Sequence, residues 1–352
     1  MDTISFARGV PAPECLPVEE FADCAREAVM RDGHTILSYG PGGGYGPLRT
    51  WIAERHGVDP KRVLLSNGSL QGFVFLAQKL APGRRVLVED PTYDRPLKIL
   101  RELGADVVPV AMDDEGLDPD ALEAALEGEP PAFLYTIPTF QNPSGRTLST
   151  ERRRRVVELA QAANLLVLED DPYGLIRFEG EAQPSLFDLS EKTIAYSSSF
   201  SKTIAPGVRV GWFVFSEELA AELEAVANST YITPALLGEA AVYEFVRRGN
   251  FEPNLVRVNG LLKARRDAMM AALEQHLPQT TWSKPEGGYF TWIEFPEGVD
   301  AAELARRAEG VTLVLGTDFG GAPNTARLAY SYVSPEEIAV GVERLAAALA
   351  TF

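Results

Sequence analysis

Cysteine and histidine are scarce in this chain of 352 residues, which holds two cysteines and three histidines. Cys15 and Cys24 stand nine positions apart with no histidine beside them. This spacing fits neither a zinc site nor a disulfide framework. It is typical of proteins in a reducing compartment, so we expect a cytoplasmic location and no bound metal.

Long apolar runs and an excess of positive charge are missing as well. No apolar run approaches the roughly 20 residues that a helix needs to cross a bilayer. Residues 1–6 lack a basic stretch followed by an apolar one, so we expect no signal peptide. The formal net charge is −17, and a field of that sign repels phosphate backbones. We therefore expect neither nucleic acid nor a membrane as partner.

One dense basic run, residues 152–155, contrasts with this acidic composition. It follows Ser149-Thr150-Glu151, a typical start of a helix, and it begins a helical pattern. We interpret these four arginines as a solvated helix face rather than as a nucleic-acid contact.

Apolar runs alternate with helical patterns from about residue 60. The predicted strands are residues 63–65, 86–88, 107–110, 132–137, 165–168, 194–197 and 210–215. The predicted helices between them are residues 69–80, 96–103, 119–126 and 150–163. Continuous apolar runs indicate strands that are buried on both faces. The alternation predicts an α/β fold with a mainly parallel sheet between helices.

The pattern changes after residue 215. Residues 217–276 are largely helical, and strands at 289–295, 311–315 and 326–332 precede a closing helix at 335–350. This order predicts a smaller α+β domain, and the length of the chain agrees with two domains. We expect a large domain over residues 31–255, and a small domain formed by residues 1–30 together with 256–352.

Lys202 differs in its setting from the other six lysines. It follows an apolar strand through a serine-rich segment, and a ligand site in an α/β sheet lies beyond the carboxyl ends of the strands. Ser199 and Ser201 add hydroxyls and Arg209 adds a guanidinium, which together suit a phosphate. The segment predicts a reactive lysine beside a phosphate-bearing ligand. A serine-rich loop with an ordinary lysine is the alternative.

Two further clusters follow predicted strands. The segment 168–173, Leu-Glu-Asp-Asp-Pro-Tyr, places three carboxylates at a strand end, where they would hold magnesium or simply face solvent. The segment 66–71, Ser-Asn-Gly-Ser-Leu-Gln, is a strand-to-helix turn whose free N–H groups suit an anion. The nucleotide-binding patterns GxxxxGK and GxGxxG are missing, which disfavours a nucleotide ligand.

Together these segments resemble the pyridoxal-phosphate (PLP)-dependent aminotransferases of fold type I, in particular the 2-aminoadipate and kynurenine aminotransferase subgroup. The likeness runs from Ile4 to the last predicted helix, and SSFSKTIAPGVRVGW at 198–212 is its specific part. VEDPTY, YTIPTFQNPSG and LEDDPYG follow the family's order. The resemblance implies a mainly parallel mixed sheet sandwiched by helices, with a smaller α+β domain. It also implies ping-pong exchange of amino groups between an L-amino acid and a 2-oxo acid.

The same resemblance implies roles for individual residues. Lys202 would form a Schiff base with PLP and then act as the general base and acid that moves a proton during amino-group transfer. Asp170 would pair with the pyridine nitrogen, Tyr173 and Asn142 would bond the phenolic oxygen, and Tyr93 would stack on the ring. The residues expected to hold the phosphate are Gly68, Ser69, Leu70, Ser199, Ser201 and Arg209.

The resemblance also implies contacts to the substrate and to a second subunit. Arg327 would bind the substrate α-carboxylate through both arms of its guanidinium, with Asn142 and Gly9 beside it. Tyr39 would reach the phosphate in a neighbouring subunit, so we expect an obligate homodimer. Arg8 stands where the family usually has glycine, which makes it a candidate contact for an acidic group on the substrate side chain.

Substrate specificity and reaction type stay open at this point. Leu315 replaces the family's usual proline, and Asp318 lies near the expected pocket mouth. Other fold type I PLP enzymes, such as β-lyases, decarboxylases and aminocyclopropane-carboxylate synthases, share this machinery. A non-catalytic PLP effector-sensing domain of a regulator is a further alternative. Such regulators carry an N-terminal winged helix, and we expect none before Ile4.

Overall fold

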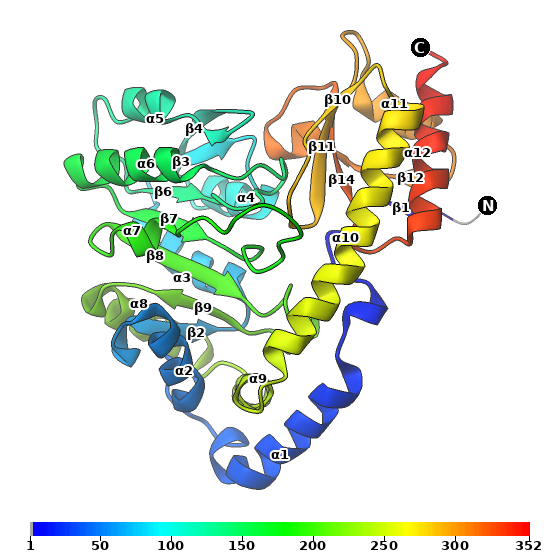
Figure 1. Ribbon diagram of the computed structural model, residues 1–352. Helices are drawn as coiled ribbons and strands as arrows, with labels where there is room; N and C mark the ends of the chain where they lie inside the picture. Colours follow the sequence, from blue (N-terminus) through cyan, green and yellow to red (C-terminus); the bar gives the residue numbers. More distant parts are fainter. Residues whose placement is uncertain (1–2) are drawn as a thin grey trace.

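A large sheet occupies the centre of the molecule. In the computed structural model, which describes residues 3–352, it has eight strands (Figure 1). In spatial order they are β2 (Val63–Ser66), β9 (Gly211–Val214), β8 (Ile194–Ser199), β7 (Val167–Asp170), β6 (Phe133–Thr136), β3 (Arg85–Asp90), β4 (Asp106–Asp113) and β5 (Gly116–Leu117). The neighbours from β8 to β4 pair in parallel, whereas β9 and β5 are antiparallel to theirs. The predicted mainly parallel mixed sheet is confirmed.

Helices cover both faces of this sheet. On one face Leu64, Val86 and Phe133 pack against α3, α4 and α8, and on the other Leu65 and Leu87 pack against the remaining helices. The helices are α1 (Val18–Ile36), α2 (Gly46–His56), α3 (Ser69–Leu80), α4 (Asp94–Glu102), α5 (Pro119–Ala125), α6 (Thr150–Ala162), α7 (Leu186–Leu189), α8 (Glu217–Tyr231) and α9 (Leu236–Arg247). Since successive strand side chains point to opposite faces, apolar runs without alternation supply both cores.

A second, smaller sheet has its own apolar core. Within residues 3–352 it consists of the antiparallel strands β10 (Thr281–Trp282), β11 (Phe290–Glu294), β14 (Thr325–Ala329) and β13 (Val314–Leu315). Beside it β1 (Ile4–Ser5) pairs in parallel with β12 (Val311–Thr312). Helices α10 (Phe251–His276), α11 (Ala301–Arg307) and α12 (Pro335–Leu349) complete this part. Phe6 is buried in the same core, which places the start of the chain beside its end (Figure 1).

Helix α10 connects the two parts. It runs from α9 beside the large sheet to α12 beside the small one (Figure 1). Helix α10 has 26 residues. Neither it nor any other helix in the described part of the chain is both long and apolar enough to cross a membrane. Short 3-10 helices complete the fold at η1 (Pro13–Cys15), η2 (Pro60–Arg62), η3 (Pro206–Val208) and η4 (Gly316–Phe319).

Three sequence-based expectations are wrong in detail. Strand β4 is partly exposed rather than buried on both faces, because its outer neighbour is the two-residue strand β5. The predicted strand 311–315 is two strands, since β12 pairs with β1 and β13 pairs with β14. The basic run 152–155 is not a solvated face throughout, because Arg153 is fully buried. It lies three and four positions before Val156 and Val157, on the face of α6 that packs against the sheet.

Six strands of the large sheet, β2 and the five from β8 to β4, run in the same direction, so their carboxyl ends lie at one edge. Strand β2 runs in the same direction as β8, because both are antiparallel to β9. Ser66, Asp90, Thr136, Asp170 and Ser199 therefore end their strands at this common edge. In open α/β sheets such an edge is where ligands bind.

Candidate active site

Lys202 lies at this edge, in the turn that follows β8. Its Nζ donates a hydrogen bond of 2.7 Å to the carbonyl oxygen of Gly9, which belongs to the N-terminal segment. The same nitrogen lies 5.7 Å from the ring centre of Tyr173 and 5.1 Å from that of Tyr289. Lys202 thus sits between the large sheet, two aromatic rings and the entrance segment.

The surroundings of Lys202 lower the pKa of its ammonium group below that of an ordinary lysine. Burial, together with the positive charges of Arg327 and Arg209, lowers the pKa of Lys202 to about 8. The ammonium loses hydration and, within residues 3–352, no carboxylate offsets this loss, so its charged form is disfavoured. A much larger fraction of this amine is therefore a neutral nucleophile near pH 7 than of an exposed lysine.

A cradle for an anion lies beside the lysine, at the start of α3. Gly68 precedes α3 with a φ of +88°, and a Cβ there would lie 2.1 Å from Nη2 of Arg209. That Nη2 donates to the Asn67 carbonyl at 2.9 Å, so the guanidinium lies against the turn. A Cβ at Gly211 would lie 2.2 Å from the backbone nitrogen of Ser69. Glycine at both positions permits close approach, and a helix N-terminus with a guanidinium suits a phosphate.

The serine hydroxyls of the lysine segment join this cradle. Ser199 pairs across β8 and β9 with Gly211, which contacts the start of α3. The Oγ atoms of Ser199 and Ser201 lie 2.8 Å apart. The structure thus brings together the residues predicted for the phosphate, although they come from three segments of the chain.

Asp170 ends β7 as a buried carboxylate. It accepts hydrogen bonds from the hydroxyls of Tyr135 at 2.8 Å and Ser197 at 3.2 Å, and burial raises its pKa to about 6. A cavity of about 50 Å³ beside it is lined also by Tyr93 and Leu70. A cation placed there, such as a protonated ring nitrogen, would lower the pKa of Asp170 and keep it ionised.

Tyr135 and Ser197 are functional candidates that the sequence analysis missed. Ser197 pairs with Asp170 across β7 and β8, and Tyr135 pairs with Leu168 across β6 and β7. The signal was the strand register, since residues near the carboxyl ends of neighbouring parallel strands lie side by side. The run Phe133–Thr136 has no apolar–polar alternation, so the sequence did not indicate which face of the sheet Tyr135 would take.

Arg327 and Asn142 meet on the side of the small sheet. Arg327 Nη1 donates to Asn142 Oδ1 at 3.0 Å, and Nη2 donates to the Ala7 carbonyl at 3.0 Å. The guanidinium lies 4.2 Å from the ring centre of Phe290, and burial lowers its pKa. Within residues 3–352 its Nε is buried without a hydrogen-bond partner. A buried donor without an acceptor is costly, and a carboxylate ligand would supply that acceptor.

Comparison with known proteins identifies this arrangement. The sequence matches the family Aminotransferase class I and II over residues 4–345. The chain is a member of this family, and it is an aminotransferase. A 2-aminoadipate transaminase of Thermus thermophilus is 39% identical over 98% of this chain and 90% of its own length. An aromatic-amino-acid aminotransferase of Thermococcus litoralis is 35% identical over 98% of this chain and 87% of its own.

Solved structures agree with this assignment. The alpha-aminoadipate aminotransferase LysN of Thermus thermophilus, solved with N-(5'-phosphopyridoxyl)-L-leucine, superimposes with a TM-score of 0.95 at 37% identity. The match covers 99% of this chain and 92% of that one. The aminotransferase therefore has the fold of the fold type I PLP-dependent transferases, as the resemblance implied.

Two other predicted residues of this aminotransferase have exposed side chains. Tyr39 is 78% exposed, and Arg8 is exposed with its guanidinium 5.0 Å from the ring centre of Tyr332. Asp171, considered for magnesium, accepts the Gly174 N–H at 2.8 Å and the hydroxyl of Tyr196 at 3.0 Å instead. No cluster of three or more metal-binding side chains occurs in the part of the chain that the structure describes.

Proposed function

We propose that this aminotransferase holds pyridoxal 5'-phosphate on Lys202 and exchanges amino groups between an L-amino acid and a 2-oxo acid. The carrying observation is the half-buried Lys202 amine, whose pKa is lowered to about 8, near the anion cradle of Gly68 and Arg209. The phosphopyridoxyl compound bound in the similar LysN structure supports this cofactor. When bound, PLP supplies an electron-withdrawing ring that stabilises negative charge at the substrate Cα.

The side chains around the cofactor site would divide the work. Lys202 would take the proton from the Cα of the amino-acid substrate. In the second half of the exchange it would deliver a proton to the Cα of the 2-oxo acid, which becomes an amino acid. Asp170 would hold a proton on the ring nitrogen, and Asn142 and Tyr173 would donate hydrogen bonds to the ring oxygen. Tyr93, whose pKa burial raises to about 12, stays a neutral phenol suited to stacking. The phosphate would be held by Gly68, Ser69, Leu70, Ser199, Ser201 and Arg209.

The substrate would lie between Arg327 and the entrance segment. The guanidinium of Arg327 offers a planar pair of donors for an α-carboxylate, and the Gly9 carbonyl lies beside the Lys202 amine. The exposed Arg8 guanidinium would meet an acidic group at the far end of a substrate side chain. The aminoadipate and aromatic amino acids named for the similar enzymes are the first substrates to test.

We extend the proposal to subunits and domains. The large domain would span residues 31–255, and residues 1–30 with 256–352 would form the small domain. Helix α1 would lie at this boundary, because its Cys24 and Ala28 pack in the core of the large sheet. A homodimer would bring the exposed Tyr39 of one subunit to the phosphate of the other. The exposed side chain of Tyr39 is accessible for such a contact, and tyrosine is enriched at protein–protein interfaces.

One experiment tests the proposed function directly. Holoenzyme is reduced with borohydride and digested, and mass spectrometry must then place a pyridoxyl group on Lys202. A panel of amino donors with an added 2-oxo acid identifies the reaction. Transfer of the amino group without release of ammonia or carbon dioxide supports transamination. Release of either product would point to another fold type I activity, and a missing adduct would overturn the site.

The rate at which PLP attaches to cofactor-free enzyme should follow the ionisation of Lys202. Since the neutral amine is the nucleophile, the rate rises with pH and is half-maximal near pH 8, where the lowered pKa lies. Stopped-flow absorbance measures this attachment rate at pH values from about 6 to 10, with the ionic strength held constant. A rate still climbing steeply at pH 10 would show that Lys202 behaves as an ordinary lysine.

Replacing Arg327 with lysine should raise KM for every amino acid tested by roughly 10- to 100-fold, the cost of one lost charge-assisted hydrogen bond. Lysine keeps the positive charge but not the planar pair of donors. Arg306→Lys, an exposed arginine of α11, is the matched control and should leave KM unchanged. An increase limited to one substrate would assign Arg327 to side-chain recognition instead.

A further inference from the structure

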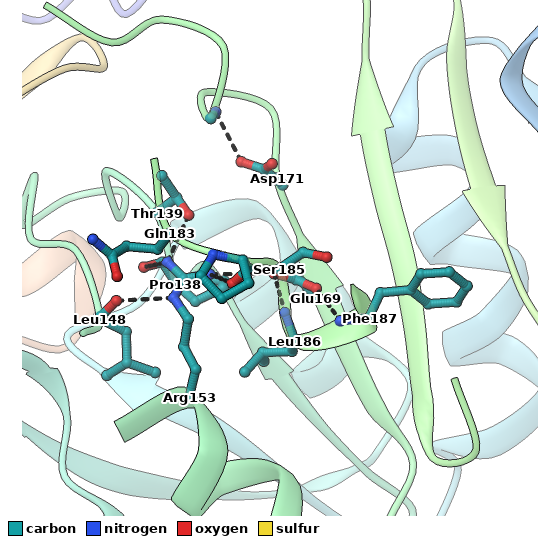
Figure 2. A network of polar contacts seen from close by, with 12 residues as sticks. Pro138, Thr139, Leu148, Arg153, Glu169, Asp171, Gln183, Ser185, Leu186 and Phe187 are labelled. Atoms are coloured by element: carbon teal, nitrogen blue, oxygen red, sulfur yellow. Dashed lines mark hydrogen bonds and ion pairs between the residues drawn. The ribbon is translucent and has the colours of Figure 1, made fainter. Parts of the chain in front are cut away.

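Arg153 is a fully buried arginine that reaches both ends of the segment carrying Asn142 (Figure 2). Its Nη2 donates to the Pro138 carbonyl at 2.8 Å, and its Nε donates to the Leu148 carbonyl at 2.8 Å. Nη2 also donates to Thr139 Oγ1 at 2.8 Å. One rigid guanidinium therefore fixes where residues 138–148 leave β6 and where they enter α6.

The same guanidinium faces the strand that carries Asp170. Its Nη1 lies 3.6 Å from Oε1 of Glu169, the residue before Asp170 in β7. The Glu169 carboxylate also accepts the N–H groups of Leu186 at 3.0 Å and Phe187 at 2.9 Å, at the start of α7 (Figure 2). Strand alternation turns Glu169 away from the cofactor site while Asp170 faces it.

Burial of this charged pair is not explained by stability. Removing two charges from water costs several kcal/mol, and apolar residues of similar volume often stabilise such positions equally well. Burial raises the pKa of Glu169 to about 8, with a smaller contribution from Asp171, which reflects that cost. An apolar pair could not bind the three backbone carbonyls, of Pro138, Leu148 and Pro184, to which the Arg153 guanidinium donates. The contacts of Arg153 therefore indicate that its role is to hold residues 138–148 in a fixed position.

We propose that Arg153 is a positioning residue for transamination, which holds Asn142 and Asp170 in fixed relation to one another. The inference rests on the proposed roles of those two residues. Asn142 already accepts a hydrogen bond from Arg327, which leaves its amide N–H groups free to donate to the cofactor. A shift of residues 138–148 would move this donor and the substrate-binding guanidinium together.

The test compares Arg153→Met with Arg152→Met, the same substitution at the preceding residue. Arg152 lies outside the site and binds Asp113 on the surface through two contacts of 2.7 Å. The readouts are the pH at which the absorbance of the bound cofactor titrates, kcat, KM and the thermal midpoint. A purely structural role would lower the thermal midpoint of Arg153→Met without moving the titration.

For Arg153→Met we expect the titration midpoint to rise by about one pH unit, the size of one lost hydrogen bond to an ionised group. A donor to the ring oxygen stabilises its anion, so a misplaced Asn142 makes the chromophore keep its proton to higher pH. kcat should fall about tenfold, which corresponds to the same free energy, and Arg152→Met should match the wild type. A wild-type titration and kcat in folded Arg153→Met would overturn the proposal.

Two further variants keep the result decisive. Arg153→Lys keeps the charge but cannot reach both carbonyls, and it carries the test with the same expected shift if Arg153→Met does not fold. Failure of both variants to fold would assign Arg153 a structural role and overturn the proposal. Asn142→Ala separates the two hypotheses. If Asn142→Ala leaves the titration unchanged, the proposed role of Asn142 fails, whereas a shift there without one in Arg153→Met refutes the positioning role alone.

Discussion

Replacing Lys202 with alanine is expected to abolish the reducible link to the cofactor and to lower turnover by about four orders of magnitude. The size is the upper end of what a positioned general base contributes. Five of the other six lysines are exposed and the sixth, Lys263, pairs with Glu179 and Asp267, so we expect none of them to substitute for Lys202. Mass spectrometry after borohydride reduction and steady-state turnover with the best donor measure the two effects.

The matched control is Lys192→Ala, which removes an exposed lysine before β8 and should leave both quantities unchanged. Lys202→Ala should still fold, because the side chain contributes one hydrogen bond, to the Gly9 carbonyl. A small primary amine in the buffer should restore part of the turnover, since it can carry the proton that the missing side chain carried. A pyridoxyl group on another lysine, with normal turnover, would contradict the assignment.

The sequence predicted the elements around the site to within a few residues. Helix α3 begins and ends where predicted, because Asn67 and Gly68 break the apolar run of β2 just before it. Helices α1 and α2 were not predicted. Helix α1 is kinked at Asp32, where φ is −136°, and its buried side chains are those of Cys24, Ala28 and Ile36, so few large apolar residues mark it in the sequence.

Some residues of the candidate site could likewise be predicted from the sequence, and others could not. Residues that act through their type near a strand end, such as Lys202 and Asp170, stand out in the sequence because a charged side chain lies a few residues beyond an apolar run. Residues that act through partners far along the chain do not. Arg153 looks like any arginine of a basic run, and its acceptors at Pro138 and Leu148 are backbone carbonyls that sequence does not distinguish.

Replacing Asp170 with asparagine should leave PLP bound and lower turnover at least about 100-fold, the value of a charge-assisted hydrogen bond of roughly 3 kcal/mol lost in the transition state. Asparagine keeps the shape, and its Oδ1 accepts the hydrogen bond of one of the two hydroxyls, Tyr135 or Ser197, while its amide N–H can donate to the other. It lacks the negative charge that would hold a proton on the ring nitrogen. Without that proton the ring withdraws electrons poorly, so the proton at the substrate Cα is less acidic.

The neighbouring carboxylate provides the control for this prediction. Asp171 lies next in sequence, but it bonds to Gly174 and Tyr196 on the other face of the sheet. Asp171→Asn should therefore keep turnover within a few-fold of the wild type, while Asp170→Asn keeps KM but loses kcat. Single-turnover rates with a donor deuterated at Cα measure the step itself. They should show a larger isotope effect in Asp170→Asn, because removal of that proton then limits the rate. If both variants slow equally, general disturbance of β7 and not the charge of Asp170 is the cause.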